Sequence, residues 1–194
     1  MFRNEKKTAL QRKDRSNKGS WDDRIKELCE LINSNDCYYT TSSCSGRISL
    51  LKQFPEKQKN VFLYNSHEPA NFDSFKNVLS GIEYDGAVFF QFEPCIIHVV
   101  CKDVMYADAL IKIAWQAGMR KSGMVDLKRN ICQIAGNEFM GFRIMEQGKI
   151  LVNDEFLQHV LNDANEKLRR NWEKIERLKE LVNLSYNTAS SKDF

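Results

Sequence analysis

The run from Ser42 to Arg47 is the most informative short segment of the sequence for chemistry. It consists of Ser42, Ser43, Cys44, Ser45, Gly46 and Arg47. Small residues let backbone N–H groups approach a ligand closely, and serine hydroxyls can donate or accept hydrogen bonds. The planar guanidinium of Arg47 suits a carboxylate or a phosphate. Because the run follows a predicted strand, we expect a ligand-binding loop, although an ordinary polar hairpin turn fits the same residues.

Histidine and glutamate side chains near predicted strands are the candidates for moving a proton. His98 stands in a run of isoleucine and valine, where it is either a hydrogen-bonded core histidine or a group that faces a cleft. Glu93 also has apolar neighbours, where an unpaired carboxylate is costly, so we expect an arginine or histidine partner. His67, which follows a short predicted strand, is a further candidate base.

A second glycine-bounded segment, Gly118 to Gly123, leads from a predicted helix into a predicted strand. Arg120 and Ser122 lie inside it, and Gly123 permits a close backbone approach to a ligand. Taken alone, the segment is more typical of a helix end followed by a solvated basic turn.

Other kinds of catalytic site have less support. Cys44 can be a nucleophile as a thiolate, but no base accompanies it in sequence, which favours a packing role. The spacing of Cys95, His98 and Cys101 suggests zinc. In a strand, however, His98 points away from both cysteines, so we predict no metal site. No G-x-G-x-x-G motif follows a strand, so the sequence has no Rossmann-type cofactor fingerprint.

Basic charge is concentrated at the N-terminus. The whole chain has a net charge of only +3, whereas residues 1–18 contain a clear excess of bases, including Lys13, Arg15 and Lys18. A basic arm on a nearly neutral body suits contact with phosphates, although a solvated tail has the same composition.

Length and composition indicate a cytoplasmic globular protein. A chain of 194 residues is long enough for one domain with a real core. The N-terminus lacks an apolar stretch of the signal-peptide type, and the longest apolar runs are too short to cross a bilayer. The six cysteines are therefore expected to be free thiols rather than disulfides.

Hydrophobic periodicity predicts an α+β fold. Helices are expected over residues 20–35, 71–80, 103–117 and 153–184, and strands over 38–41, 48–51, 61–64, 87–92, 95–101, 124–127, 131–135 and 139–145. Because strands and helices do not alternate regularly, we expect a mixed sheet with a long C-terminal helix rather than a doubly wound fold. The predicted organisation is a basic arm over 1–18, a single catalytic domain over 19–184 and a frayed tail over 185–194.

Several segments together resemble the tRNA wybutosine-synthesising protein 3 family. They include the residues 16–20, the run from Tyr39 to Ile48, Ser66-His67, Phe92-Glu93-Pro94 leading into His98, Gly118-x-Arg120-x-Ser122-Gly123, and Ala164-Asn165-x-Lys167 in the last helix. The resemblance runs in order from about residue 14 to 180 of the sequence. Small departures are Ala117, where a serine is frequent, and Cys95, where a bulky apolar residue is usual.

This resemblance implies a function. Members of the family methylate N4 of the tricyclic wybutosine precursor next to the anticodon of phenylalanine tRNA, with S-adenosylmethionine as methyl donor and without the usual methyltransferase fold. It implies that Ser42 to Arg47, Arg120, Ser122 and Gly123 bind the cofactor, and that His67, Glu93 or His98 orients or deprotonates the acceptor nitrogen. Lys13, Arg15 and Lys18 would contact the tRNA, and other enzymes of the wybutosine pathway are candidate partners.

Two other classes of protein fit parts of the sequence. A non-catalytic tRNA-binding protein would have the same arm and fold, and its RNA affinity would not depend on His67 or His98. A thiol enzyme would depend entirely on Cys44, whereas a positioning role for that residue predicts only a partial loss of activity on substitution.

Overall fold

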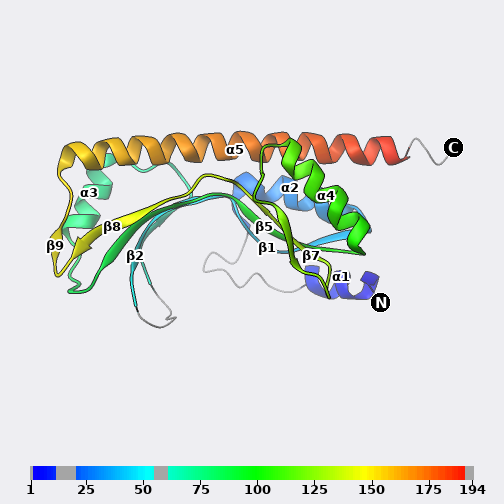
Figure 1. The fold of residues 1–194 in the computed structure, drawn as a ribbon, viewed down its shortest axis with the longest axis horizontal. Coiled ribbons are helices and arrows are strands. Elements are labelled where there is room, and N and C mark those ends of the chain that lie inside the picture. Colours follow the sequence, from blue (N-terminus) through cyan, green and yellow to red (C-terminus); the bar gives the residue numbers. More distant parts are fainter. Residues whose placement is uncertain (1, 12–20, 55–60, 191–194) are drawn as a thin grey trace. The chain divides into compact units, whose positions relative to one another are not determined.

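The computed structural model describes residues 2–11, 21–54 and 61–190 (Figure 1). Their contacts divide the chain into two compact units. The first unit contains the described parts of Met1–Ser45, Cys95–Asn137 and Asn171–Phe194, and the second contains those of Gly46–Pro94 and Glu138–Arg170. The predicted α+β class is confirmed, while the strands that we expected in one mixed sheet form two antiparallel sheets. A single catalytic domain over 19–184 stays a prediction.

The first unit has a four-stranded sheet in the order β1-β5-β7-β6. Its strands are β1 (Tyr38–Cys44), β5 (Ile96–Cys101), β7 (Ile131–Ala135) and β6 (Gly123–Asp126). One face packs against α2 (Asp23–Ser34), α4 (Val104–Gln116) and the C-terminal part of α5 (Asp154–Ser190). The helix predicted over residues 20–35 is confirmed, and its apolar residues Ile25, Leu28, Cys29 and Ile32 are all buried in this core.

Helix α1 (Phe2–Leu10) lies on the other face of this sheet (Figure 1). The ring of Phe2 packs against Tyr39, with centroids 5.4 Å apart, whereas the neighbouring Tyr38 belongs to the helix-covered core. Residues 2–10 are therefore helical, which corrects the prediction of an arm without regular structure over 1–18. The hydrophobic periodicity of the sequence did not predict α1, because individual contacts rather than a long apolar stripe hold this helix in place.

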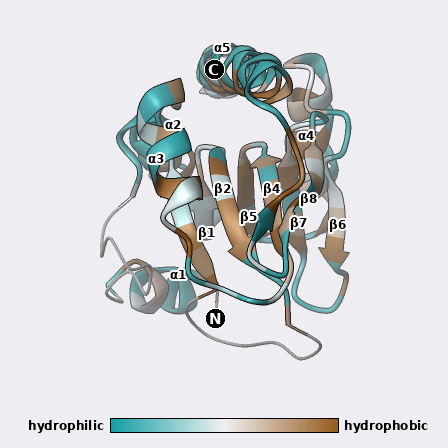
Figure 2. Cartoon of the chain, turned by 90° about the vertical axis from the view of Figure 1, so that its left-hand side faces the viewer, coloured by the Kyte–Doolittle hydropathy of each residue, from teal (hydrophilic) through white to brown (hydrophobic). Residues whose placement is uncertain are grey.

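The second unit has a five-stranded sheet in the order β3-β2-β4-β8-β9. Its strands are β3 (Phe62–Ser66), β2 (Arg47–Lys52), β4 (Val88–Glu93), β8 (Met140–Glu146) and β9 (Lys149–Ile150), and helix α3 (Phe72–Ser80) packs on it. Aromatic rings form much of this core. Phe75 contacts both Tyr64 and Phe90 edge-on, at centroid distances of 5.0 and 5.8 Å. Strand β2 lies between β3 and β4 in this sheet, and hydrophobic residues make up much of it (Figure 2).

Helix α5 contributes residues to both units. Figure 2, which looks nearly along this helix, shows both hydrophilic and hydrophobic residues around it. Its buried apolar residues recur about every 3.5 positions. They are Leu157, Val160, Leu161, Ala164 and Leu168 in the second unit and Ile175, Leu178 and Val182 in the first. Phe156, near the start of the helix, is 49% exposed, and the helix continues to Ser190, beyond its predicted end at Leu184.

Two short breaks explain why the strands separate into two sheets. Ser42, Ser43 and Cys44, which we expected in a loop, belong to β1 and pair with β5, and Arg47 already begins β2. Only Ser45 and Gly46 remain between the strands, and Gly46 has a φ of +97°, a conformation that favours glycine. Pro94 lies between β4 and β5, the strands predicted over 87–92 and 95–101, where its lack of an N–H interrupts strand pairing.

Within the described ranges, none of the helices combines the length and the apolar character needed to span a bilayer.

Candidate functional site

Ser45 is held from several sides in the first unit. Its backbone N–H and its hydroxyl both donate to Asp22 Oδ2, at 3.0 and 3.2 Å. Its carbonyl oxygen accepts a bond from Asn171 Nδ2 at 2.6 Å. The other amide atom of Asn171, Oδ1, accepts from the backbone N–H of Cys95 at 2.7 Å. Because Ser45 and Asn171 are fully buried, these bonds fix the end of β1 next to the start of β5.

These bonds change the expected role of Ser45. Its N–H and its hydroxyl are already paired with Asp22, so they serve the structure of the segment rather than a ligand. Asp22 precedes α2 as its N-cap residue, but its side chain makes no cap bond to the helix. Neither Asp22 nor Asn171 was among the predicted site residues. The available signal was an asparagine in the apolar stripe of α5, because a buried amide needs hydrogen-bond partners.

A polar row crosses the first sheet on the face that α2 and α4 leave open. Ser42, His98, Gln133 and Gly123 are successive cross-strand partners on β1, β5, β7 and β6. The Ser42 hydroxyl lies 2.9 Å from His98 Nδ1, and Gln133 Oε1 lies 3.2 Å from His98 Nε2. An amide oxygen can only accept, so Nε2 carries the proton and Nδ1 accepts from the serine. The prediction that His98 points away from Cys95 and Cys101 is confirmed, because both cysteines are buried in the core.

The row ends beside open space. A Cβ atom added at Gly123 would meet no other atom within 4 Å. Gly123 was predicted to bind the cofactor, and at this position a ligand can approach the backbone without a side chain in the way.

The segment between α4 and β6 is an ordered turn. Ser122 is buried, and its hydroxyl donates to Met119 O at 2.7 Å and accepts from the N–H of Ala135 at 3.1 Å. Trp115 Nε1 donates to the carbonyl oxygen of Ser122 at 3.0 Å. The hydroxyl of Ser122 therefore shapes the turn, while Arg120 is exposed. The predicted cofactor contacts of both residues stay predictions.

Arg47 and Glu93 form an ion pair in the second unit. They are cross-strand partners on β2 and β4, and Arg47 Nε donates to Glu93 Oε2 at 2.6 Å. The guanidinium also stacks over the ring of Phe62 at 4.7 Å. The prediction that Glu93 needs an arginine or histidine partner is thereby confirmed with arginine. Both Nη groups of Arg47 lack a hydrogen-bond partner among the described residues, and the side chain is 28% exposed.

His67 follows β3 in the same unit. Its Nδ1 lies 2.8 Å from the carbonyl oxygen of Gly46. A carbonyl can only accept, so Nδ1 carries a proton, and in the neutral ring the lone pair lies on Nε2. The structure thus orients a histidine by a backbone group, an arrangement that suits a general base.

The six cysteines are free thiols, as predicted. Burial raises the pKa of Cys29 to about 11 and raises that of Cys95 well above its usual value. Such thiols are poor nucleophiles because little thiolate forms. Cys44 lies half-buried at the end of β1. The predicted RNA-binding residues Lys13, Arg15 and Lys18 lie outside the described residues.

Comparisons with known proteins agree on one family. Residues 4–183 match the family model described as Methyltransferase TYW3. A mouse protein named tRNA wybutosine-synthesizing protein 3 homolog is 34% identical over 179 residues, covering 89% of this chain and 69% of that protein. An Arabidopsis thaliana protein named tRNA wybutosine-synthesizing protein 2/3/4 is 37% identical, but the match spans only 18% of its length.

Archaeal relatives are similar over most of the chain. An Archaeoglobus fulgidus protein named tRNA(Phe) 7-((3-amino-3-carboxypropyl)-4-demethylwyosine(37)-N(4))-methyltransferase is 36% identical, and the match covers 81% of each chain. The solved structure of the PH1069 protein from Pyrococcus horikoshii is 32% identical, with a TM-score of 0.83 and coverage of 94% of both chains. The chain belongs to the methyltransferase TYW3 family.

Proposed function

We propose that this protein transfers a methyl group to N4 of the tricyclic wybutosine precursor in phenylalanine tRNA. Membership of a methyltransferase family supports the reaction type, and the name of the archaeal relative supports the acceptor. The position of that base next to the anticodon belongs to the proposal. The cytoplasmic location and an association with other enzymes of the wybutosine pathway stay predictions.

The observation that carries the mechanism is the orientation of His67 by Gly46. Methyl transfer from a sulfonium to a ring nitrogen forms a nitrogen–carbon bond while the sulfur–carbon bond breaks and a thioether leaves, and the nitrogen must lose its proton to a base. With its Nδ1 proton directed at the carbonyl oxygen of Gly46, the neutral ring of His67 has a lone pair at Nε2. We assign His67 as the base that receives this proton.

His98 suits a different role. Both of its ring nitrogens are engaged, with Nδ1 accepting from Ser42 and Nε2 donating to Gln133. With both nitrogens bonded to side chains of the same sheet, His98 suits holding the Ser42 hydroxyl in place. We therefore assign His98 as a positioning residue and Ser42 as the group that it presents.

The methyl donor of the proposal is S-adenosylmethionine, which supplies an activated methyl group on a sulfonium. Arg47 fits a donor of this kind because its Nη groups are available to pair with a carboxylate, while Glu93 fixes the direction of the guanidinium through Nε. The open space beside Gly123 allows a ligand to approach the first sheet. Glu93 then acts through Arg47 rather than on the acceptor nitrogen.

The assignment is tested by comparing three histidine variants in single-turnover methylation assays with phenylalanine tRNA that contains the precursor base. His67→Asn keeps a side-chain N–H that can donate to Gly46 but removes the base, so we expect a rate loss of about 10²–10⁴-fold. His98→Asn should lose less. His159, an exposed residue on α5, provides the matched control, and His159→Asn should retain the wild-type rate. Equal rates for the His67 and His159 variants would refute the assignment.

A further inference from the structure

A cleft of about 660 Å³ lies between α1 and the open face of the first sheet. Residues of α1 form one wall, and residues of β1, β5 and the turn before β7 form the other. Its lining is mostly polar. The uncharged polar residues in the lining include Asn4, Thr8, Tyr39, Thr41 and Asn130.

The charges in the cleft favour an anionic ligand. Lys102, Lys128 and Arg129 line it and are exposed, whereas Glu5 is the acid among the lining residues. The hydroxyls of Thr8 and Thr41 donate to the carbonyl oxygens of Asn4 and His98, at 2.9 and 3.4 Å, so their oxygens can accept from ribose hydroxyls. Three positive charges with several neutral donors are typical of a surface that follows a phosphate backbone.

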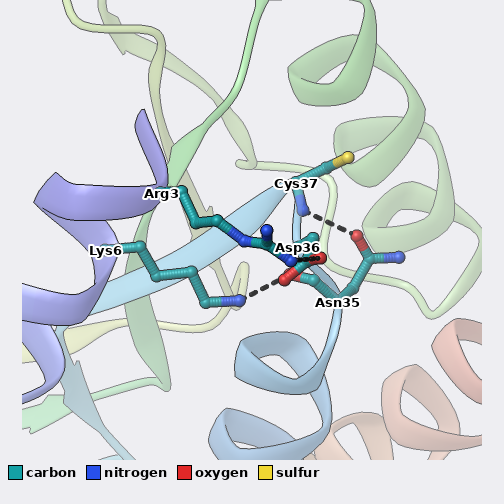
Figure 3. A network of polar contacts seen from close by, with 5 residues as sticks. All are labelled: Arg3, Lys6, Asn35, Asp36 and Cys37. Carbon is teal, nitrogen blue, oxygen red and sulfur yellow. Dashed lines mark hydrogen bonds and ion pairs between the residues drawn. The ribbon is translucent and has the colours of Figure 1, made fainter. Parts of the chain in front are cut away.

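Helix α1 is held against the first unit by side-chain contacts, so the cleft has a defined wall on that side. Lys6 Nζ donates to the carbonyl oxygen of Asn35 at 2.7 Å (Figure 3). Asn35 is the C-cap residue of α2, where a cation is favourable for the helix dipole. Lys6 is largely buried, and desolvation lowers its pKa. Arg3 also pairs with Asp36 at 3.1 Å, although both side chains are well exposed and such pairs contribute little.

The cleft adjoins the polar row that contains His98. Thr41, which lines the cleft, directly precedes Ser42 on β1. Val100, another lining residue, is two positions from His98 on β5 and therefore on the same face, roughly 7 Å along the strand. A strand of nucleic acid in the cleft would thus continue toward Ser42 and His98.

We propose that this cleft binds the ribose–phosphate backbone of the substrate RNA. Lys102, Lys128 and Arg129 pair with successive phosphates, and the neutral lining residues contact phosphate or ribose oxygens. The choice of RNA rests on the proposed function. The cleft itself is defined by its charges and by the docking of α1.

The test measures binding of a fluorescently labelled phenylalanine tRNA transcript as a function of salt. The cleft variant combines Lys102→Ala, Lys128→Ala and Arg129→Ala. The matched control, with the same change in net charge, combines Lys26→Ala, Lys112→Ala and Arg177→Ala, which are exposed residues of the same unit away from the cleft. Circular dichroism establishes that both variants are folded.

Each phosphate contact contributes roughly 0.7–0.9 to the slope of log affinity against log salt, so the cleft variant should lose about 2–3 from that slope. Between about 50 and 200 mM salt, the advantage of the wild-type protein over this variant should shrink by about 20- to 40-fold. The control variant should keep a slope close to the wild-type value. Equal slopes for the two variants would overturn the proposal.

A substitution that removes a negative charge from the cleft provides a second test. Glu5→Gln removes a negative charge from the cleft and should tighten tRNA binding by about 2- to 3-fold at low salt. Glu180→Gln, on an exposed part of α5 in the same unit, should change the affinity less. Weaker binding by the Glu5 variant would contradict the proposal. If the cleft variant binds tRNA more weakly but the wild-type protein transfers no methyl group, only the proposed function is refuted. If the wild-type protein transfers the methyl group and the cleft variant keeps the same tRNA affinity and KM, only the role of the cleft is refuted.

Discussion

Replacement of Asn171 by leucine gives a sharp test of the hydrogen bonds around Ser45. Leucine has a similar size and matches the apolar stripe of α5, so hydrophobicity alone predicts a more stable protein. In the structure, however, the amide of Asn171 satisfies the carbonyl oxygen of Ser45 and the N–H of Cys95. Asn171→Leu leaves both backbone groups buried without that partner.

The expected cost follows from these two groups. Each buried backbone group that loses its partner costs about 1–3 kcal/mol, or about 2–6 kcal/mol together. The added apolar burial offsets roughly 1–2 kcal/mol, which leaves a net loss of about 2–3 kcal/mol at the middle of these ranges. For a chain of this size, the Tm should fall by roughly 3–15 °C.

The assay is thermal and urea unfolding followed by circular dichroism. Asn183→Leu is the matched control, because Asn183 is exposed on the same helix, and it should change stability by less than about 0.5 kcal/mol. An Asn171→Leu protein as stable as the wild type, or more stable, would refute this reasoning.

Three further predictions concern other buried or paired groups. Asn165→Leu should also cost about 2–3 kcal/mol in urea unfolding, because its amide bonds both the N–H and the carbonyl oxygen of Ala70, at 2.8 and 2.9 Å. A double-mutant cycle of Arg47→Gln and Glu93→Gln should give a coupling of about 0.5–1 kcal/mol, and zero coupling would mean that the ion pair contributes nothing to stability. Burial raises the pKa of Cys29 from 9.0 to about 11, so the buried neutral thiol stabilises the folded state below about pH 9, and this contribution to the free energy of unfolding is lost as pH rises toward 11. Cys29→Ala should therefore flatten the alkaline loss of stability by about 2–3 kcal/mol, and a slope as steep as that of the wild type would count against this linkage.

The regular elements were largely predictable because their periodicity is strong. Asp103 caps α4 by accepting from the N–H groups of Met105 and Tyr106, and Gly118 ends that helix with a φ of +89°. Both residue types are typical of these positions, so the boundaries of the helix were visible in sequence.

The exceptions arise where tertiary contacts outweigh local preference. Ser42 and Ser43 are residues of a type common in turns, yet pairing with β5 places them in a strand. Helix α1 depends on Lys6 and Phe2, which meet partners distant in sequence, and neither contact leaves a periodic pattern.

The candidate site was predictable where burial of a charged residue without a partner would cost free energy. The apolar surroundings of Glu93 required a partner, and Arg47 is that partner. The partners of Ser45 could not be predicted, because Asp22 and Asn171 come from distant parts of the chain. Sequence spacing carries no information about such contacts unless the fold is known.

The measurement that tests the central claim most directly is methyl transfer by the wild-type protein. Purified protein is incubated with S-adenosylmethionine and phenylalanine tRNA that contains the unmethylated tricyclic base, and the digested nucleosides are analysed by mass spectrometry. We predict that the tricyclic nucleoside gains the mass of one methyl group and that no other nucleoside does. An unchanged tricyclic nucleoside, with tRNA binding intact, would contradict the account and favour a non-catalytic tRNA-binding protein.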